Sequence, residues 1–220
     1  MAPAADQPSR DCRPLNTLPA TASGIAVIVA AAFTLSVYAL GAQSAQMALH
    51  IGLMNVAAPL LSAALASKLP GMLGRPQALW LAAGAQVILL WGWHLPFLQQ
   101  AAMASHALHV LMQTTLFAAA FLFWSAIIVV PTAARWQAIA ALLLTGKLAC
   151  LLSALLIFSP RALYEIAGHT GVALDDQQLA GLLMITACPI SYLIAAVVVA
   201  AQTVGRPGKV PPQRTASTAG

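Results

Sequence analysis

Long apolar stretches alternate with short polar connections along this chain. Residues 14–67 and 76–134 contain no Asp, Glu, Lys or Arg, and each run is long enough for two membrane spans of about 20 residues with a connection between them. The hydropathy pattern marks six apolar segments, at residues 23–41, 47–67, 78–98, 105–130, 136–158 and 179–203. The pattern therefore predicts about six transmembrane segments.

These segments are predicted to be α-helices. They are about twice as long as a membrane β-strand needs and show no alternation of apolar and polar positions. A helix also satisfies its own backbone hydrogen bonds within one segment, as the bilayer interior requires. We expect an all-α polytopic membrane bundle over residues 23–203, with disordered cytoplasmic tails at residues 1–22 and 204–220.

The composition agrees with a protein embedded in a lipid bilayer. The chain is 60% hydrophobic and only 7% charged, whereas soluble domains carry roughly 25% charged residues. The net charge is +5, but the basic residues stand singly beside apolar segments, which argues against a nucleic-acid surface. The 3 cysteines form no CxxC pair, so the sequence indicates neither a disulfide framework nor a zinc site.

The distribution of charge predicts the orientation. With six spans, every basic residue outside the apolar segments except Arg161, which lies in the connection at 159–178, falls on one side, which the positive-inside rule makes cytoplasmic. These residues are Arg10, Arg13, Lys68, Arg75, Arg135, Arg206, Lys209 and Arg214. The connection at 159–178 lies on the other side and holds Glu165, Asp175 and Asp176. Both termini are expected in the cytoplasm.

This topology gathers the histidines at the external face. They are His50 in the second segment, His94 at the end of the third, His106 and His109 at the start of the fourth, and His169 in the last external connection. A preference of histidine for membrane interfaces accounts for their depth, but that preference does not select one side. The asymmetry makes them candidates for a shared site.

Methionines accompany two of these histidines at helical spacing, where residues three or four apart share a face. The neighbours are Gln46, Met47 and Met54 around His50, and His106, Met112 and Gln113 around His109. Imidazole with thioether sulfur is a ligand set that suits copper. The alternative is that these methionines fill gaps in the core. Because each has a methionine beside it at helical spacing, His50 and His109 are the first-choice metal ligands. His94 and His106 are further candidates.

Four other residues within the apolar segments could have a role. Lys147 lies halfway along the fifth segment, where a charge costs about 3 kcal/mol and usually faces the bundle interior with a partner. Cys150 and Cys188 lie at similar depth, with Met184 one turn before Cys188. These sulfur atoms could be deeper ligands on a transfer path, or buried side chains with a packing role only.

Three stretches of the chain resemble one known family. Asp176-Gln177-Gln178, followed by Gly181 and Met184, resembles the Asp-Gln-Gln-x-x-Gly-x-x-Met signature of the caa3-type cytochrome c oxidase assembly factors, the CtaG family. The stretch at 47–61, with its Met, His and Ala-Pro-Leu-Leu, is similar to the family's second helix. The stretch at 94–124, with His-Leu-Pro, a later His and Phe-Trp, is similar to its third and fourth helices.

The resemblance implies a non-enzymatic factor in a bacterial cytoplasmic membrane that takes part in maturation of haem-copper oxidase. Copper would be its cargo, and oxidase subunits and the lipid bilayer its partners. The chain departs from the family pattern at Gln46 and Gln113, which stand where the family has histidines. A glutamine amide is a poorer copper ligand than imidazole. Asp175 and Asp176, with Gln177 and Gln178, would either support ligand imidazoles or cap the last helix.

Two other functions fit parts of the pattern. His50 and His109 on facing helices could be axial ligands of a b-type haem. Lys147 could mark a small-solute or metal transporter, although the chain shows no two matching halves with interrupted helices. Nothing marks an activated serine, and neither Asp175 nor Asp176 lies within an apolar segment, so the sequence gives no sign of intramembrane hydrolysis.

Overall fold

The computed structural model describes residues 41–164 and 170–204. The first expected segment, both tails, Glu165 and His169 lie outside these residues. The described residues form helices joined by short connections, without strands. In chain order the elements are α2 (Ala42–Ile51), the π-helix η1 (Gly52–Ala57), α3 (Ala58–Ala64), the 3-10 turns η2 (Ala66–Lys68) and η3 (Gly71–Gly74), α4 (Pro76–Trp93), α5 (Pro96–Ala104), α6 (His106–Val129), η4 (Thr132–Ala134), α7 (Arg135–Phe158) and α8 (Thr170–Val204).

The prediction of an all-α membrane bundle is confirmed. Within the described residues, 4 helical segments are long and apolar enough to cross a bilayer, namely Ala42–Ala64, His106–Val129, Thr132–Phe158 and Ala173–Val204. The pair formed by α4 and α5 gives a fifth candidate, although it bends by 74°. These segments correspond to the last five of the six expected from the hydropathy pattern.

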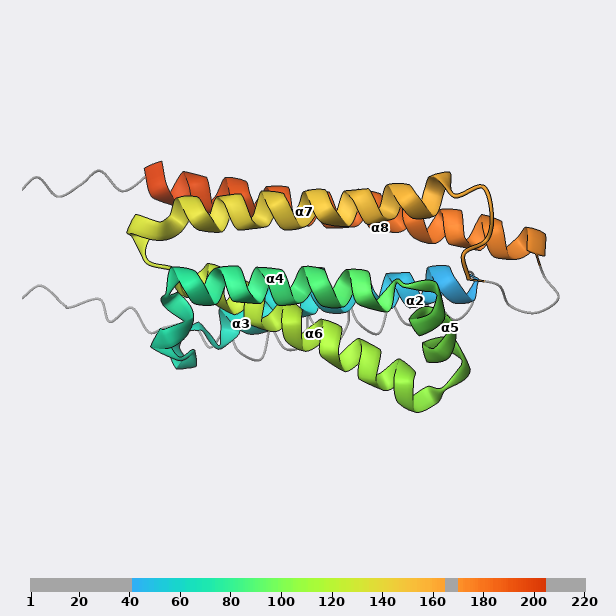
Figure 1. Cartoon of the computed structure of the whole chain (residues 1–220). Coiled ribbons are helices and arrows are strands. Elements are labelled where there is room, and N and C mark those ends of the chain that lie inside the picture. The colour runs from blue at the N-terminus through green and yellow to red at the C-terminus, as the bar shows by residue number, and fades with distance from the viewer. Residues whose placement is uncertain (1–40, 165–169, 205–220) are drawn as a thin grey trace, which may run out of the picture.

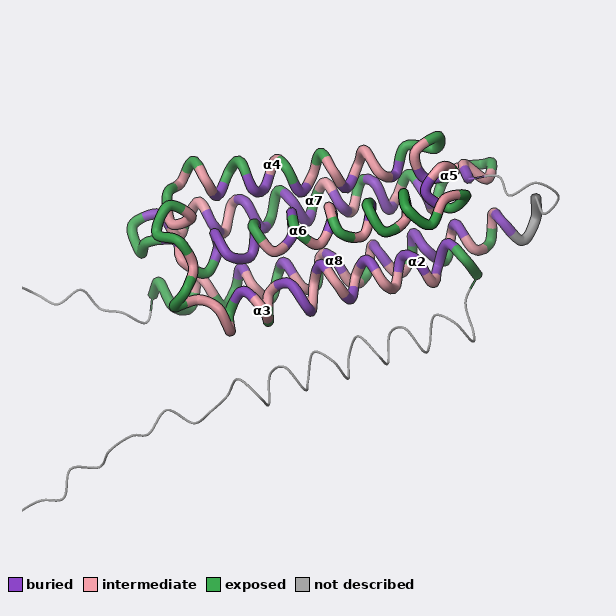
Figure 2. The backbone as a smooth tube through the Cα atoms, turned by 90° about the horizontal axis from the view of Figure 1, so that it is seen from below, coloured by how far each residue is buried: buried purple, intermediate pink, exposed green. Residues whose placement is uncertain are grey.

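The long helices run roughly along one direction (Figure 1). α7 and α8 lie side by side along most of their length, and buried positions recur on the inward side of each helix (Figure 2). The connections after α3 and α6 lie at one end of the bundle, where a Cβ added to Gly74 would lie 3.0 Å from the Val129 carbonyl oxygen. Arg135 donates to the Gln202 carbonyl at the same end, at 3.0 Å. The basic connections that the structure describes therefore lie together.

Small residues bring the helices close. Gly181 on α8 faces α7 so closely that an added Cβ would lie 2.8 Å from Cγ1 of Ile157 and 3.1 Å from the Ser153 carbonyl oxygen. Many alanines are also fully buried in the core, including Ala58, Ala120, Ala126, Ala138 and Ala141. Close backbone approach of this kind is the main way for helices to associate where lipid offers no hydrophobic driving force.

A break in the α4–α5 pair corrects the expected third segment. Leu95 has an extended backbone, with ψ 134°, because the residue before a proline is held out of the helical region. Pro96 then starts a new helix, since its fixed φ suits the first helical position. His94 consequently lies at the corner, as the C-cap of α4. Residues 99–104, expected as a loop, belong to α5.

The start of the last helix was also predicted wrongly. α8 begins at Thr170 rather than near residue 179, so Asp175 and Asp176 lie inside it and do not cap it. Residues 42–46, expected as a connection, likewise form the start of α2. In both places polar residues continue a helix beyond its apolar part, because their side chains find hydrogen-bond partners in a neighbouring element.

A π-helical turn interrupts the span formed by α2 and α3. The Ala58 N–H bonds the Leu53 carbonyl, five residues back. Pro59 has no N–H and cannot bond the carbonyl of Met54 in the same register. The indole N–H of Trp124 donates to that Met54 carbonyl instead, at 2.8 Å. The proline thus accounts for the wider turn, a feature that occurs often at functional sites.

Candidate functional site

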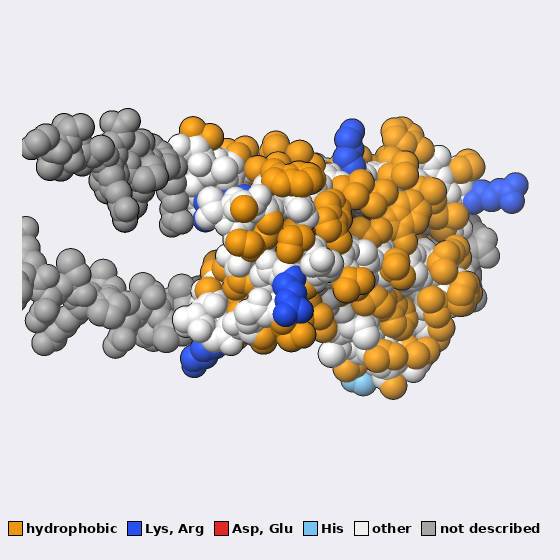
Figure 3. Space-filling model, turned by 60° about the vertical axis from the view of Figure 1, so that its left-hand side comes forward, with side chains coloured by type: hydrophobic (Ala, Val, Ile, Leu, Met, Phe, Trp, Pro, Cys, Tyr) orange, Lys and Arg blue, Asp and Glu red, His pale blue; other side chains and the backbone are white. Residues whose placement is uncertain are grey.

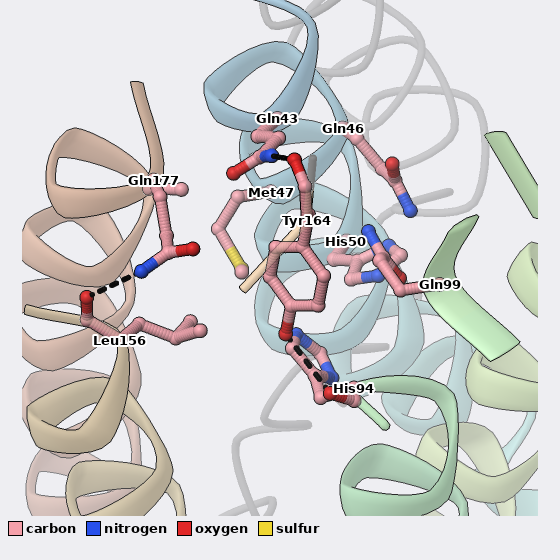
Figure 4. A pocket seen from close by; sticks show the side chains of 10 residues that line it. Gln43, Gln46, Met47, His50, His94, Gln99, Leu156, Tyr164 and Gln177 are labelled. Carbon is pink, nitrogen blue, oxygen red and sulfur yellow. Dashed lines mark hydrogen bonds between the residues drawn. The ribbon is translucent and has the colours of Figure 1, made fainter. Parts of the chain in front are cut away.

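A small cavity lies between α2, α4 and α5, at the end of the bundle away from the basic connections (Figure 1), and Figure 4 shows the side chains that line it. Its volume is about 10 Å³, roughly what one water molecule needs. Side chains from α2, α4, α5, α7 and α8 and from the α7–α8 connection line it, namely Gln43, Gln46, Met47, His50, His94, Gln99, Leu156, Tyr164, Gln177 and Ala180. Polar groups therefore converge inside an otherwise apolar bundle.

Two of the predicted ligands, His50 and His94, meet at this cavity. Their ring centroids are 5.9 Å apart, with the ring planes at 72°. The side chains are only 3% and 5% exposed. His50 comes from the last turn of α2, and the proline-induced corner after α4 places His94 opposite it.

The hydrogen bonds of His94 leave one ring nitrogen available. Nδ1 lies 2.7 Å from the Leu90 carbonyl oxygen, and because a carbonyl can only accept, Nδ1 carries the proton. Nε2 therefore holds a lone pair, and it is buried without a hydrogen-bond partner. The hydroxyl of Tyr164 donates to the His94 backbone carbonyl at 2.9 Å, which fixes the residue at the corner. Burial raises the pKa of this tyrosine, so the hydroxyl remains a donor.

His50 has a similar arrangement. Its Nδ1 is 2.9 Å from Oε1 of Gln113 on α6. With the amide oxygen accepting, Nδ1 is the protonated nitrogen and Nε2 carries the lone pair. Both imidazoles are thus held by a second group at Nδ1, as ligand histidines are in metal sites.

Further unpartnered acceptors surround the same cavity. The side-chain oxygens of Gln43, Gln46 and Gln99 are buried without hydrogen-bond partners. Leaving such a group unsatisfied costs about 1–3 kcal/mol. All three atoms, like Nε2 of His94, offer lone pairs and not protons. The chemistry of this set therefore fits a cation or a hydrogen-bond donor.

Asp176 holds the N-terminus of α2 and thereby positions the residues that follow. Its carboxylate accepts from the backbone N–H groups of Gln43 and Ser44 at 2.9 and 3.0 Å, and from the Ser44 hydroxyl. A negative charge is also favourable at a helix N-terminus. Gly41 makes the approach possible, because an added Cβ would overlap the Asp176 carboxyl group.

The neighbours of Asp176 in the signature have different environments. Gln177 is fully buried, donating to the Leu156 carbonyl at 3.0 Å and accepting from the Leu163 N–H at 2.6 Å. It joins α7 and α8 to the connection between them. Asp175 is exposed and Gln178 is half-buried. Within the signature, Asp176 and Gln177 therefore hold α2, α7 and α8 together at this end of the bundle.

The other predicted site residues are placed differently. His106 is exposed and His109 half-buried, and neither lines the cavity. Met112 is buried and accepts from Nε2 of Gln46 at 3.3 Å. The structure thus places His94 beside the ring of His50, whereas His109 lies outside the cavity lining. The cavity is also far too small for the haem that the alternative interpretation requires.

Lys147 does not face the interior. Its side chain is exposed on the outer surface of α7, and Cys150 is half-buried. On the face that Figure 3 shows, the described surface is largely hydrophobic, with isolated basic side chains standing out from it. Met54, Met184 and Cys188 line a second cavity, deeper in the bundle than the first.

Sequence reasoning missed several residues of this site. Gln43 and Gln99 lie in segments expected as loops, and Tyr164 lies in the last external connection. The amides at positions 43 and 46 are one helical turn apart in an apolar neighbourhood. That spacing is the signal that could have marked them, had the helix been extended to residue 42.

The fold and the site together define a helical membrane protein with a buried His–Met–amide cavity at one end. Within the described residues, no three His, Cys, Asp or Glu side chains gather in a metal-holding group. Residues 13–206 match the family described as cytochrome c oxidase caa3 assembly factor (Caa3_CtaG). The chain belongs to this family. Comparison with curated proteins and with solved structures gives no match.

Proposed function

We propose that this protein holds copper, as Cu(I), between His50 and His94 during assembly of a haem-copper oxidase. The observation that carries the proposal is the buried lone pair of His94 Nε2, which has no partner and lies beside the imidazole of His50. Met47 lines the same cavity and supplies a thioether. Two imidazoles with a thioether are ligands that copper accepts and that suit zinc or magnesium less well.

The absence of acidic groups from the lining favours a monovalent ion. A charge buried in an apolar interior is costly unless it is compensated, and no carboxylate appears among the residues that line this cavity. Cu(I) brings one charge where Zn²⁺ or Cu²⁺ would bring two. The amide oxygens of Gln43, Gln46 and Gln99 offset part of it through their dipoles.

The role is binding and delivery rather than catalysis. A site near the end of a membrane bundle gives an ion a short exit toward a client protein. On the charge asymmetry of the chain, this end faces the external side of a bacterial cytoplasmic membrane. The partners are then subunits of the oxidase, reached within the plane of the membrane.

Variants of the two histidines test this function. His50→Ala and His94→Ala should each lower Cu(I) affinity at least about tenfold, since each removes one of few ligands, and should reduce oxidase activity in cells. His106→Ala is the matched control, because His106 is exposed and outside the cavity. The proposal fails if both cavity variants insert normally and retain copper and oxidase activity at the level of the control.

A further inference from the structure

A second cavity lies deeper in the bundle and shares a wall with the first. Its volume is also about 10 Å³. Its lining residues are Met47, His50, Ile51, Met54, Asn55, Leu90, Ala149, Met184, Cys188 and Tyr192. Met47 and His50 line both cavities. The two spaces are therefore neighbours along α2 and η1, separated by side chains that are themselves potential ligands.

Sulfur atoms dominate the chemistry of this second cavity. Met47, Met54, Met184 and Cys188 all line it, with exposures of 6%, 5%, 1% and 7%. They come from α2 and η1, which follow each other directly, and from α8 near the other end of the chain. Methionine alone is usually a filler of core gaps. Four sulfur-bearing side chains with an imidazole around one small space form a soft donor set of the kind that selects Cu(I).

The π-helical turn builds one wall of the cavity. It contains Met54 and Asn55, and Nδ2 of Asn55 donates to Sγ of Cys188 at 3.2 Å. Hydrogen bonds to sulfur tune metal–thiolate centres, and this bond holds the thiol toward η1. Oδ1 of Asn55 is buried without a partner. The wall thus offers a further lone pair beside the sulfur atoms.

An aromatic cluster lies on the side of the cavity toward the basic connections. The rings of Trp124 and Tyr192 stack with centroids 5.7 Å apart, and Phe123 packs against Tyr192 at 6.1 Å. The side chain of Gln86 donates to the Tyr192 hydroxyl. These groups fill the bundle on that side of the second cavity, whereas its wall toward the first cavity consists of Met47 and His50.

We propose that the second cavity is a holding site for a soft monovalent metal ion, with Met54, Met184 and Cys188 as its own donors. Met47 and His50, which border both cavities, would pass the ion between the two positions. When Cu(I) binds Cys188, the Cu–S bond replaces the S–H bond and the thiol proton is released to the solvent. The Cu(I)–thiolate unit is neutral, which suits an apolar surrounding. This inference rests on the proposed function of the first cavity.

The stoichiometry of Cu(I) binding to the full-length protein in detergent tests this site. Ag(I), which is redox-inert, serves as the second probe. The wild type should bind two ions per chain. The double variant Met184→Leu with Cys188→Ser should bind one, and sulfur scattering in its X-ray absorption spectrum should fall. Cys150→Ser combined with Met103→Leu is the matched control, since neither residue lines the cavity.

The outcomes separate this inference from the function on which it rests. If the double variant elutes like the folded wild type and still binds as many ions, the second site is wrong. If a single ion binds and is lost only in His94→Ala, the first site stands and the second falls. If a single ion binds and is lost only in the double variant, the second cavity is the metal site and the proposed role of His94 fails.

Discussion

Two hydrogen bonds hold His94 in place and leave Nε2 of its ring without a partner. Its ring donates to the Leu90 carbonyl, and its backbone carbonyl accepts from Tyr164. Both bonds fix the direction of Nε2, which has no partner. A lone pair fixed in this way is costly to a protein that leaves it unused, because a buried unsatisfied polar group lowers stability by about 1–3 kcal/mol. Occupation by an ion would remove that cost.

Gln46 and Gln113, which stand where the resemblance implies histidines, have distinct roles at this scale. Oε1 of Gln113 accepts from His50 and orients the imidazole. Gln46 lines the cavity and leaves its Oε1 unpartnered. The two glutamines therefore supply one orienting group and one group beside the candidate site, and the imidazoles of His50 and His94 lie together.

Gln46→His should raise the affinity for Cu(I). It places an imidazole one turn before His50, on the same face of α2, and imidazole is a better copper ligand than an amide. We expect an increase of about tenfold in a competition assay with a Cu(I) chelator. Gln100→His is the control, because Gln100 is exposed on α5. Equal affinities for the two variants would contradict a copper site in this cavity.

At the scale of elements, the N-terminus of α2 depends on a residue 132 positions away, because Asp176 bonds Ser44. Asp176→Ala removes two backbone caps and a favourable charge at the helix end. Loss of such a cap costs about 1–2 kcal/mol, so the variant should unfold at a lower temperature in detergent. Asp175→Ala should not, since Asp175 is exposed. Equal melting temperatures for the two variants would show that the cap does not contribute.

Hydropathy predicted which segments are helices but not where they end. The apolar stretches of α6 and α7 match their expected ranges within about two residues, as is usual for such boundaries. The starts of α2 and α8 were missed because Gln43, Ser44 and Asp176 satisfy one another across the bundle. No local pattern reveals such a pairing. The bend at Pro96 was readable in principle, since a proline disfavours helix in the residue before it.

Only part of the cavity lining could be predicted from the sequence, because it depends on contacts between helices that are distant in the chain. His50, His94 and Met47 were identified from residue type and depth, and they do meet. Spacing along one helix could not show which histidine on another helix faces His50, because that depends on how α2, α4 and α6 pack. The choice of His109 over His94 followed from Met112 at helical spacing, yet Met112 points toward Gln46.

At the scale of the whole molecule, the described basic connections and the two cavities define opposite ends. Orientation in the membrane then follows from the positive-inside rule. A phosphatase fused near Gln100 on α5 should be active, because that end is expected outside, and one fused after Arg206 should be inactive. The reverse pattern in whole cells would place the cavity at the cytoplasmic end and would remove the external route for copper.

The central claim is that His50 and His94 bind Cu(I) together, and X-ray absorption at the copper edge tests it most directly. With every Cu(I) site filled, the wild-type spectrum should show imidazole scattering from two histidines together with sulfur. His94→Ala should lose about half of the imidazole contribution, because one of the two rings is removed. Spectra that are identical for the wild type and His94→Ala, in a variant that still inserts and folds, would contradict the account.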